Sequence, residues 1–295
     1  MRRLMIWALA LGLVGLAGFW GLTRPQRLPD TAMANLQGDP AKGALVFFAG
    51  GCASCHAADK ASDADRLILS GGQRFASPFG TFLAPNISPN TTHGIGGWSA
   101  LDLANAMRHG VSPQGAHYYP AFPYTSYENA SLQDLADLHA YLMTLPATDI
   151  ASQPHDISFP FTIRRGLGLW KQLFANKGWV MTGDLSVELQ RGRYLVEGLG
   201  HCGECHTPRN AIGGLQRDRW LTGAPTPDGK GKVPDITPAG LNWSATDIAY
   251  YLETGFTPDF DAAGGHMASV VLNTGQLPAV DRTAIAAYLK ALPGG

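Results

Sequence analysis

Cys52-Ala53-Ser54-Cys55-His56 decides the fold, because the same pattern returns at Cys202-Gly203-Glu204-Cys205-His206 and the two copies use every cysteine in the chain. Two cysteines with two residues between them, followed at once by histidine, form the attachment motif of c-type haem. Each thiol can add to one haem vinyl group, and the adjacent histidine can bind the iron. The sequence therefore predicts two covalently bound haem c groups. The attachment residues would be Cys52, Cys55, Cys202 and Cys205, with His56 and His206 as iron ligands.

Other uses of paired cysteines fit this pattern less well. A CxxC pair also occurs in thioredoxin-like redox sites, in disulfides and as half of a zinc site. A single four-cysteine zinc site would need the two motifs to converge from distant parts of the chain, and it would require neither histidine. Two identical spacings, each followed by histidine, favour haem.

Length and composition set the broad class. A chain of 295 residues is long enough for two domains, each with its own core. The 36 glycines and 20 prolines indicate long ordered loops between short helices. A formal net charge of −1 gives no indication of nucleic-acid binding, so we expect no nucleic-acid partner.

The N-terminus reads as a membrane segment. Arg2-Arg3 precedes an uncharged apolar run from Leu4 to Leu22, which as a helix would span roughly 28 Å, close to the hydrocarbon thickness of a bilayer. A cleaved signal peptide is the alternative, with Ala32-Met33-Ala34 as a possible cleavage site. We expect residues 1–24 to be a single anchor in the cytoplasmic membrane, with the haem domains in the periplasm.

The chain also contains an internal repeat. Similar segments follow each haem motif at similar distances, and each copy continues with a serine that suits a helix N-cap and a glycine that suits a helix end. The matching pairs are Pro85-Asn86-Ile87-Ser88-Pro89 with Pro234-Asp235-Ile236-Thr237-Pro238, Trp98-Ser99-Ala100 with Trp243-Ser244-Ala245, Gly110 with Gly255, and Leu145-Pro146 with Leu292-Pro293. The sequence therefore predicts a tandem duplication of one small helical unit.

Each unit should hold a helix before the haem motif, a middle helix and a closing helix, with no strand of useful length. The expected domains are residues 35–147 and 186–295. The segment 148–185 between them is rich in aromatic residues, including Trp170, Phe174 and Trp179. We expect a short helix over Arg164–Phe174 that packs between the domains. Contact of these three aromatic side chains with a membrane surface is the alternative.

The second copy offers a sixth iron ligand. Met267 lies twelve residues after Gly255, in the glycine-rich stretch Gly264-Gly265-His266-Met267 before the closing helix, where we expect a loop. A thioether is a common partner of histidine in electron-transfer haems. A methionine that fills a gap in the core is the general alternative, and His266 is the rival ligand.

The first copy differs at this position. Twelve residues after Gly110 stands Phe122, which cannot bind iron. His117 is the nearest candidate for the sixth ligand of the first haem. An open or water-bound position, His93, His109 and Met107 remain as alternatives.

Several segments together resemble a known family. They are Cys202 to Asn210, Pro85 to Pro89, Gly94 to Ser99, and Tyr118 to Tyr127. The chain is similar in these segments to the membrane-bound cytochrome c subunits of bacterial alcohol and gluconate dehydrogenases. The resemblance implies an all-α fold with two tandem class I cytochrome c domains behind an N-terminal transmembrane helix.

The same resemblance implies a function. A diheme cytochrome of this kind would take electrons from a periplasmic or membrane dehydrogenase and pass them towards the respiratory chain, to a quinone, an oxidase or a small cytochrome. It would be an electron-transfer subunit rather than an enzyme by itself. The alternative is a haem enzyme, peroxidase-like or oxidising sulfur oxyanions, or a gas-binding sensor that uses an incompletely ligated first haem.

The chain departs from the family in two places. The family's subunits typically carry three haem motifs, and this chain has two. Their first-domain loop typically reads Pro-Ala-Met-Pro-Tyr, where this chain has Pro120-Ala121-Phe122-Pro123-Tyr124.

Overall fold

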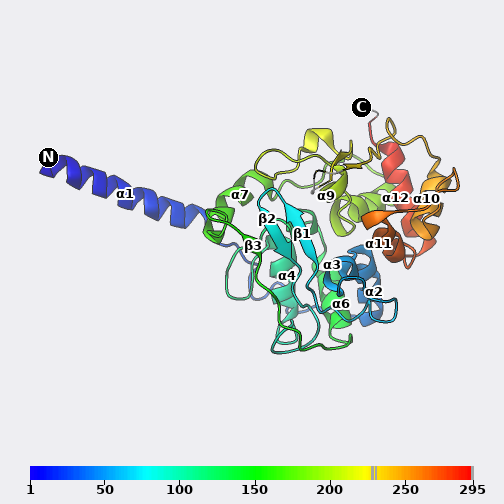
Figure 1. Cartoon of the computed structure of the whole chain (residues 1–295), viewed down its shortest axis with the longest axis horizontal. Coiled ribbons are helices and arrows are strands. Elements are labelled where there is room, and N and C mark those ends of the chain that lie inside the picture. Colours follow the sequence, from blue (N-terminus) through cyan, green and yellow to red (C-terminus); the bar gives the residue numbers. More distant parts are fainter. Residues whose placement is uncertain (227–228, 230, 294–295) are drawn as a thin grey trace.

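The computed structural model describes residues 1–226, 229 and 231–293, which are mostly helical (Figure 1). One long helix, α1 (Arg2–Leu22), projects from the body that holds the other helices, and none of its residues is buried. Within the described ranges, α1 is the one helix that is long and apolar enough to cross a membrane.

The order of helices in the body repeats. The first set is α2 (Pro40–Ala49), α3 (Cys52–His56), α4 (Ala100–His109), α5 (Tyr124–Tyr127) and α6 (Leu132–Leu142). The second set is α8 (Val187–Arg193), which continues as the π-helical η2 (Tyr194–Leu199), then α9 (Gly203–His206), α10 (Ala245–Thr254), α11 (Gly265–Thr274) and α12 (Ala279–Ala291). In both sets the first helix packs against the closing helix, α2 against α6 and α8 against α12.

A glycine permits this helix crossing in each set. A Cβ atom on Gly43 would lie 1.9 Å from the carbonyl oxygen of Asp137, and one on Gly192 would lie 2.1 Å from that of Ala284. No side chain fits at such distances, so the two helix pairs approach through bare backbone. The same close approach in both sets reflects the internal repeat of the sequence.

The middle helices begin and end as their sequences predict. The hydroxyl oxygens of Ser99 and Ser244 accept hydrogen bonds at 3.1 Å from backbone N–H groups three residues later, within capping boxes. Both helices end at a glycine in the left-handed region, Gly110 with φ 57° and Gly255 with φ 81°.

Two small sheets make the all-α prediction too simple. The antiparallel strands β1 (Arg74–Ser77), β2 (Gly80–Leu83) and β3 (Asp156–Ile157) form one sheet, and β4 (Ala224–Pro225) and β5 (Lys232–Val233) form another. These strands are two to four residues long, which is too short for alternating hydrophobicity to reveal. The fold is mostly helical, with sheets in its long loops.

The segment between the two sets forms a short helix, as expected. The turn η1 (Arg164–Gly166) leads into α7 (Leu167–Phe174), which lies at the foot of α1 (Figure 1). Trp170 donates a 2.9 Å hydrogen bond from Nε1 to the carbonyl of Ile212. The Trp179 ring stacks against the guanidinium of Arg193 at 4.7 Å. Both half-buried indoles therefore pack against the body.

Candidate haem sites

The first candidate haem site consists of Cys52, Cys55 and His56 on the one-turn helix α3. Nδ1 of His56 lies 2.9 Å from the carbonyl oxygen of Pro85. A carbonyl only accepts hydrogen bonds, so Nδ1 carries the proton and Nε2 keeps its lone pair. Burial lowers the pKa of His56 and keeps the ring neutral. The ring is thus held in the tautomer that binds iron.

The second haem site repeats this geometry with Cys202, Cys205 and His206 around α9. Nδ1 of His206 lies 2.8 Å from the carbonyl oxygen of Pro234. Pro85 and Pro234 begin the two matched proline segments of the repeat. The repeated proline segments therefore supply the carbonyls that orient the two histidines, a role that the sequence did not reveal.

The thiols do not have the character of a redox or zinc site. All four cysteines are free of disulfides. Burial raises the pKa of Cys52 and of Cys202 to about 12 and that of Cys55 to about 11. A thioredoxin-like site needs the opposite shift, because the thiolate is the reactive form. Among the residues that the structure describes, no group of three or more His, Cys, Asp or Glu side chains could hold a metal ion. These facts fit thiols that end as haem thioethers.

Met267 lies in the first turn of α11, so the expectation of a loop at this position was wrong. The helix turns neighbouring side chains to different faces. Met267 is half-buried and packs against the hydrophobic core, whereas His266 is exposed. The thioether therefore faces the interior and the rival histidine faces outwards.

Phe122 occupies the matching place in the first set and is also half-buried against the core. Its ring lies 5.7 Å from that of Tyr127 and 6.0 Å from that of Tyr118, centroid to centroid. The first set thus has an aromatic cluster around Phe122 at the place where the second set has the thioether of Met267.

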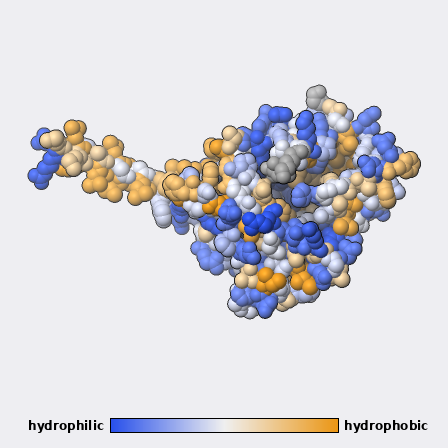
Figure 2. Space-filling model, viewed as in Figure 1, coloured by the Kyte–Doolittle hydropathy of each residue, from blue (hydrophilic) through white to orange (hydrophobic). Residues whose placement is uncertain are grey.

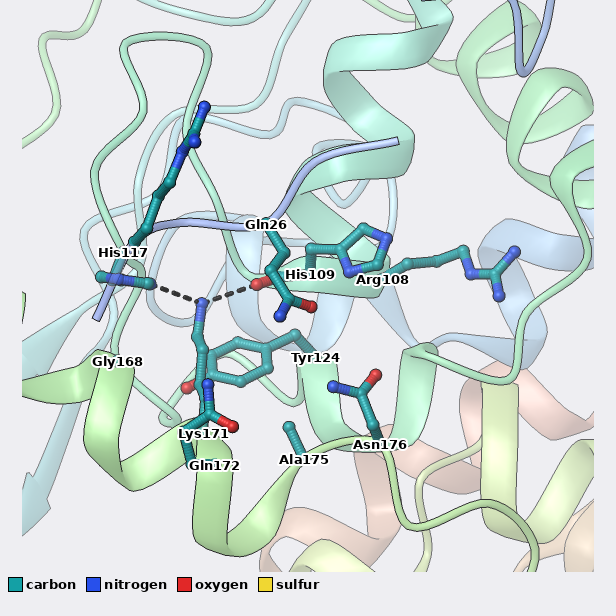
Figure 3. Close-up of a pocket in the computed structure, with 11 residues that line it drawn as sticks. Gln26, Arg108, His109, His117, Tyr124, Gly168, Lys171, Gln172, Ala175 and Asn176 are labelled. Carbon is teal, nitrogen blue, oxygen red and sulfur yellow. Dashed lines mark hydrogen bonds between the residues drawn. The ribbon is translucent and has the colours of Figure 1, made fainter. Parts of the chain in front are cut away.

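His117 is engaged on both of its ring nitrogens. Nε2 lies 2.9 Å from the carbonyl oxygen of Thr23. Nδ1 lies 3.0 Å from Nζ of Lys171, and this second contact is marked in Figure 3. The carbonyl requires a proton on Nε2, so Nδ1 accepts from the ammonium. Burial lowers the pKa of His117, in keeping with a neutral ring. Neither nitrogen is free to bind iron in this arrangement.

The pocket beside His117 is separate from the first haem site. Its lining includes His109, Tyr124 and Lys171 but none of Cys52, Cys55, His56 or Phe122 (Figure 3). His109 is thus placed on the α7 side of the domain. Of the other alternative ligands, Met107 is 4 % exposed within the core and His93 is exposed to solvent.

The two attachment helices, α3 and α9, lie where the two sets of helices meet. Desolvation is the main cause of the raised pKa of Cys55, and the nearby Cys205 adds to it. Nδ2 of Asn273 donates to the hydroxyl of Ser54 at 2.8 Å, so α11 contacts the first attachment helix. The hydroxyl of Ser126 donates to the carboxylate of Glu204 at 3.0 Å, so α5 contacts the second.

Further contacts close this interface. The hydroxyl of Tyr127 donates to the carbonyl of Gly50 at 3.1 Å, and Nε2 of His201 lies 3.3 Å from the same carbonyl oxygen. Buried apolar residues of both sets also form one continuous core. Ser54 and Glu204 occupy the variable positions of the two haem motifs, so the motif alone gives no signal of their role.

The geometry agrees with the proteins that this chain resembles. The cytochrome c family model matches residues 40–146. A diheme cytochrome c-type protein of Cereibacter sphaeroides is 58% identical over 294 residues, covering 99% of both chains. The fructose dehydrogenase cytochrome subunit of Gluconobacter japonicus is 38% identical over 259 residues, or 85% of this chain and 52% of that subunit.

A third relative is the gluconate 2-dehydrogenase cytochrome c subunit of Pantoea cypripedii, 38% identical over 283 residues. This chain spans 52% of the length of the fructose dehydrogenase subunit and 63% of that of the gluconate 2-dehydrogenase subunit.

Proposed function

The chain belongs to the cytochrome c family, and from this premise we propose that it is a membrane-anchored diheme electron carrier. Two tandem class I cytochrome c domains, residues 35–147 and 186–295, would follow the anchor of residues 1–24. The carrier would accept electrons from a periplasmic or membrane dehydrogenase and pass them towards the respiratory chain. Two relatives named as cytochrome subunits of fructose dehydrogenase and of gluconate 2-dehydrogenase support a dehydrogenase as the electron donor.

The residues of each site have distinct roles in this proposal. Cys52 and Cys55, and likewise Cys202 and Cys205, would hold the porphyrin through thioethers, and the paired histidines would bind iron from one side. Haem iron, when bound, supplies one-electron chemistry by cycling between its ferric and ferrous states. The carbonyls of the two proline segments would fix the histidine rings and keep their Nε2 lone pairs available.

The observation that carries the proposal is the facing arrangement of the two attachment helices. Asn273 of the second set donates to Ser54 on the first attachment helix. Ser126 of the first set donates to Glu204 on the second attachment helix, so hydrogen bonds tie each set to the other's attachment helix. A carrier with two redox centres benefits from such an interface, because electrons can move within one rigid body. Free diffusion of two separate domains would not keep the centres together.

The sixth ligands would differ between the sites. We assign Met267 to the second haem, because its thioether faces the core at the position that the repeat predicts. The first haem would have no protein ligand from the matching loop, where Phe122 stands. His117 could bind iron only after one of its ring nitrogens is released, Nε2 from Thr23 or Nδ1 from Lys171.

Helix α1 would anchor the carrier in the cytoplasmic membrane. Its apolar length suits a bilayer, and its residues contribute nothing to the core of the body. The arginines at its N-terminal end would stay in the cytoplasm and leave both haem sites in the periplasm.

Reduction of the haems in native membranes tests the function. Membranes of the host are supplied with alcohols, aldoses and aldonic acids in turn, and the ferrous haem absorption of this chain is followed. At least one substrate class should reduce both haems as fully as dithionite does. Membranes that lack the chain provide the control. Full reduction by dithionite with no reduction by any dehydrogenase substrate would contradict the proposal.

The first haem site supports a second candidate function. A phenylalanine in place of a methionine offers no ligand atom, so the sixth position of the first iron would be available to an external ligand, as in a haem enzyme or a gas sensor. Carbon monoxide added to the reduced protein should bind one of the two haems. Absence of any CO-binding haem would remove this candidate and leave the electron carrier in place.

Replacement of His117 by alanine should leave the visible spectrum and the CO stoichiometry unchanged. The variant should lose about 1–3 kcal/mol of unfolding free energy, because the Thr23 carbonyl and the Lys171 ammonium lose a buried partner. Chemical denaturation and absorption spectra measure the two effects.

His155→Ala is the matched control for His117→Ala, since one ring nitrogen of His155 is likewise hydrogen-bonded to the backbone: its Nδ1 accepts from the Leu83 N–H at 3.1 Å. The His155→Ala protein should likewise keep its visible spectrum and its CO stoichiometry. A new CO-binding haem, or a changed spectrum, in His117→Ala alone would show that His117 binds the first iron.

A further inference from the structure

A band of exposed apolar side chains lies beside the foot of α1. Its members come from the segment between the two sets and are Phe159 (77 % exposed), Phe161 (45 %), Ile163 (52 %), Leu169 (43 %) and Leu173 (58 %). Hydrophobic side chains gather where α1 meets the body in Figure 2, and α7 lies at this junction in Figure 1. We call these five residues the apolar collar.

The collar is fixed to the end of α1. The guanidinium of Arg165 stacks on the Trp20 ring at 4.3 Å, and its Nε donates to the hydroxyl of Thr23 at 2.8 Å. Gly168 packs so closely on Thr23 that a Cβ atom there would lie 2.6 Å from its Cα. The collar therefore keeps a set position relative to the point where the chain would leave the bilayer.

One face of α7 carries apolar side chains that do not pack against the body. Trp170 and Phe174 turn towards the body. Trp170 donates a hydrogen bond to the carbonyl of Ile212, and Phe174 packs on Gly214. Leu169 and Leu173, four residues apart on one face of α7, remain exposed. Helix α7 thus has apolar residues on two faces, and the body covers only one of them. The other face is an exposed apolar surface of the kind that binds a partner or a membrane.

Charge indicates what covers this surface. Residues 159–177 include the basic side chains Arg164, Arg165 and Lys177 and no carboxylate. The amine of Lys171, in the same segment, is turned into the body, where it donates to the carbonyls of His109 and Gly110. Arg24 lies two residues after the end of the apolar run. Exposed apolar side chains among basic ones are typical of segments that lie in the interface of an anionic membrane.

We propose that the apolar collar inserts into the leaflet that α1 leaves, so that the body rests on the membrane in one orientation. The inference depends on the anchor role proposed for α1. The hydroxyl of Tyr119 donates to the carbonyl of Phe161 at 2.9 Å, and Arg164 stacks on the Tyr119 ring at 4.8 Å. The collar would thereby hold the loop that contains Tyr119 and Phe122 next to the lipid surface.

Cysteine labelling of the full haem-loaded chain tests the collar. Single variants Leu169→Cys and Leu173→Cys are placed in nanodiscs of phosphatidylethanolamine and phosphatidylglycerol and treated with a charged, impermeant maleimide. The native cysteines do not interfere, because thioethers to haem leave no free thiol. Val187→Cys and Val280→Cys, at exposed positions on the second set, serve as aqueous controls, and Leu13→Cys reports on the anchor.

Labelling at positions 169 and 173 should be several-fold slower than at positions 187 and 280. Rates equal to these controls, with position 13 still protected, would overturn the collar and leave the anchor intact. Reaction at position 13 as well would overturn the anchor itself. Protection that appears only after a dehydrogenase is added would also overturn the proposal, since the surface would then be a protein interface.

Discussion

Replacement of Met267 by alanine is expected to open the second haem to carbon monoxide and to lower its reduction potential. Met267 is the thioether that α11 turns towards the core, at the position where the repeat predicts a sixth ligand. Loss of a thioether ligand moves the potential down by on the order of 100 mV, within the range of about 0.8 V that axial ligands span. Reduced protein should then bind two CO molecules in place of one, as CO titration of the reduced chain would measure.

The neighbouring residue provides the control for this prediction. His266→Ala removes an exposed imidazole from the same helical turn and should change neither the potential nor the CO stoichiometry. A Met267→Ala protein that keeps its potential and binds no additional CO would exclude the thioether as a ligand. A change in the His266→Ala protein alone would assign the ligand to the histidine.

Features that depend on short stretches of chain could be predicted from the sequence. The serine caps at Ser99 and Ser244 and the helix ends at Gly110 and Gly255 need only a few neighbouring residues, and all four occur as expected. The helix over Arg164–Phe174 is present as a 3₁₀ turn followed by α7. Local hydrogen bonds and backbone conformation fix these elements, so a sequence window contains the necessary information.

Features that depend on distant residues could not be predicted. Strand β3 pairs Ile157 with Gly80, and these residues are too far apart in the chain for any local pattern to indicate the pairing. The contacts of Ser54 with Asn273 and of Glu204 with Ser126 depend on how the two sets pack. The contact between Lys171 and Nδ1 of His117 also depends on how distant segments pack, and it leaves that nitrogen unavailable to iron.

The aromatic linker shows why composition alone misleads. Trp170, Phe174 and Trp179 were the candidates for membrane contact, because large aromatic residues favour the membrane interface. In the structure these rings are half-buried against the body, whereas the smaller neighbours Leu169 and Leu173 are exposed. The direction of a side chain on a short helix depends on which face the rest of the fold covers, and the sequence of the helix does not state it.

Replacement of Phe122 by methionine is expected to give the first haem the ligand that it lacks. The residue stands twelve positions after Gly110, as Met267 stands after Gly255, and its half-buried side chain already packs on the core. Phenylalanine and methionine are similar in volume, and methionine is flexible enough to adapt to the gap. The reduced variant should bind no CO, and the potential of its first haem should rise by on the order of 100 mV. CO titration and spectroscopic redox titration of the full chain measure both effects.

Phe122→Leu separates ligation from packing in this experiment. Leucine removes the aromatic contacts with Tyr118 and Tyr127, as methionine does, but it offers no lone pair. This control should keep one CO-binding haem and an unchanged or slightly altered potential. The combined variant Phe122→Met with Met267→Ala should again bind one CO, now at the second haem, because the ligand would have moved from one site to the other. Continued CO binding in Phe122→Met would mean that the loop holds residue 122 out of reach of the iron, and that another group governs the sixth position of the first haem.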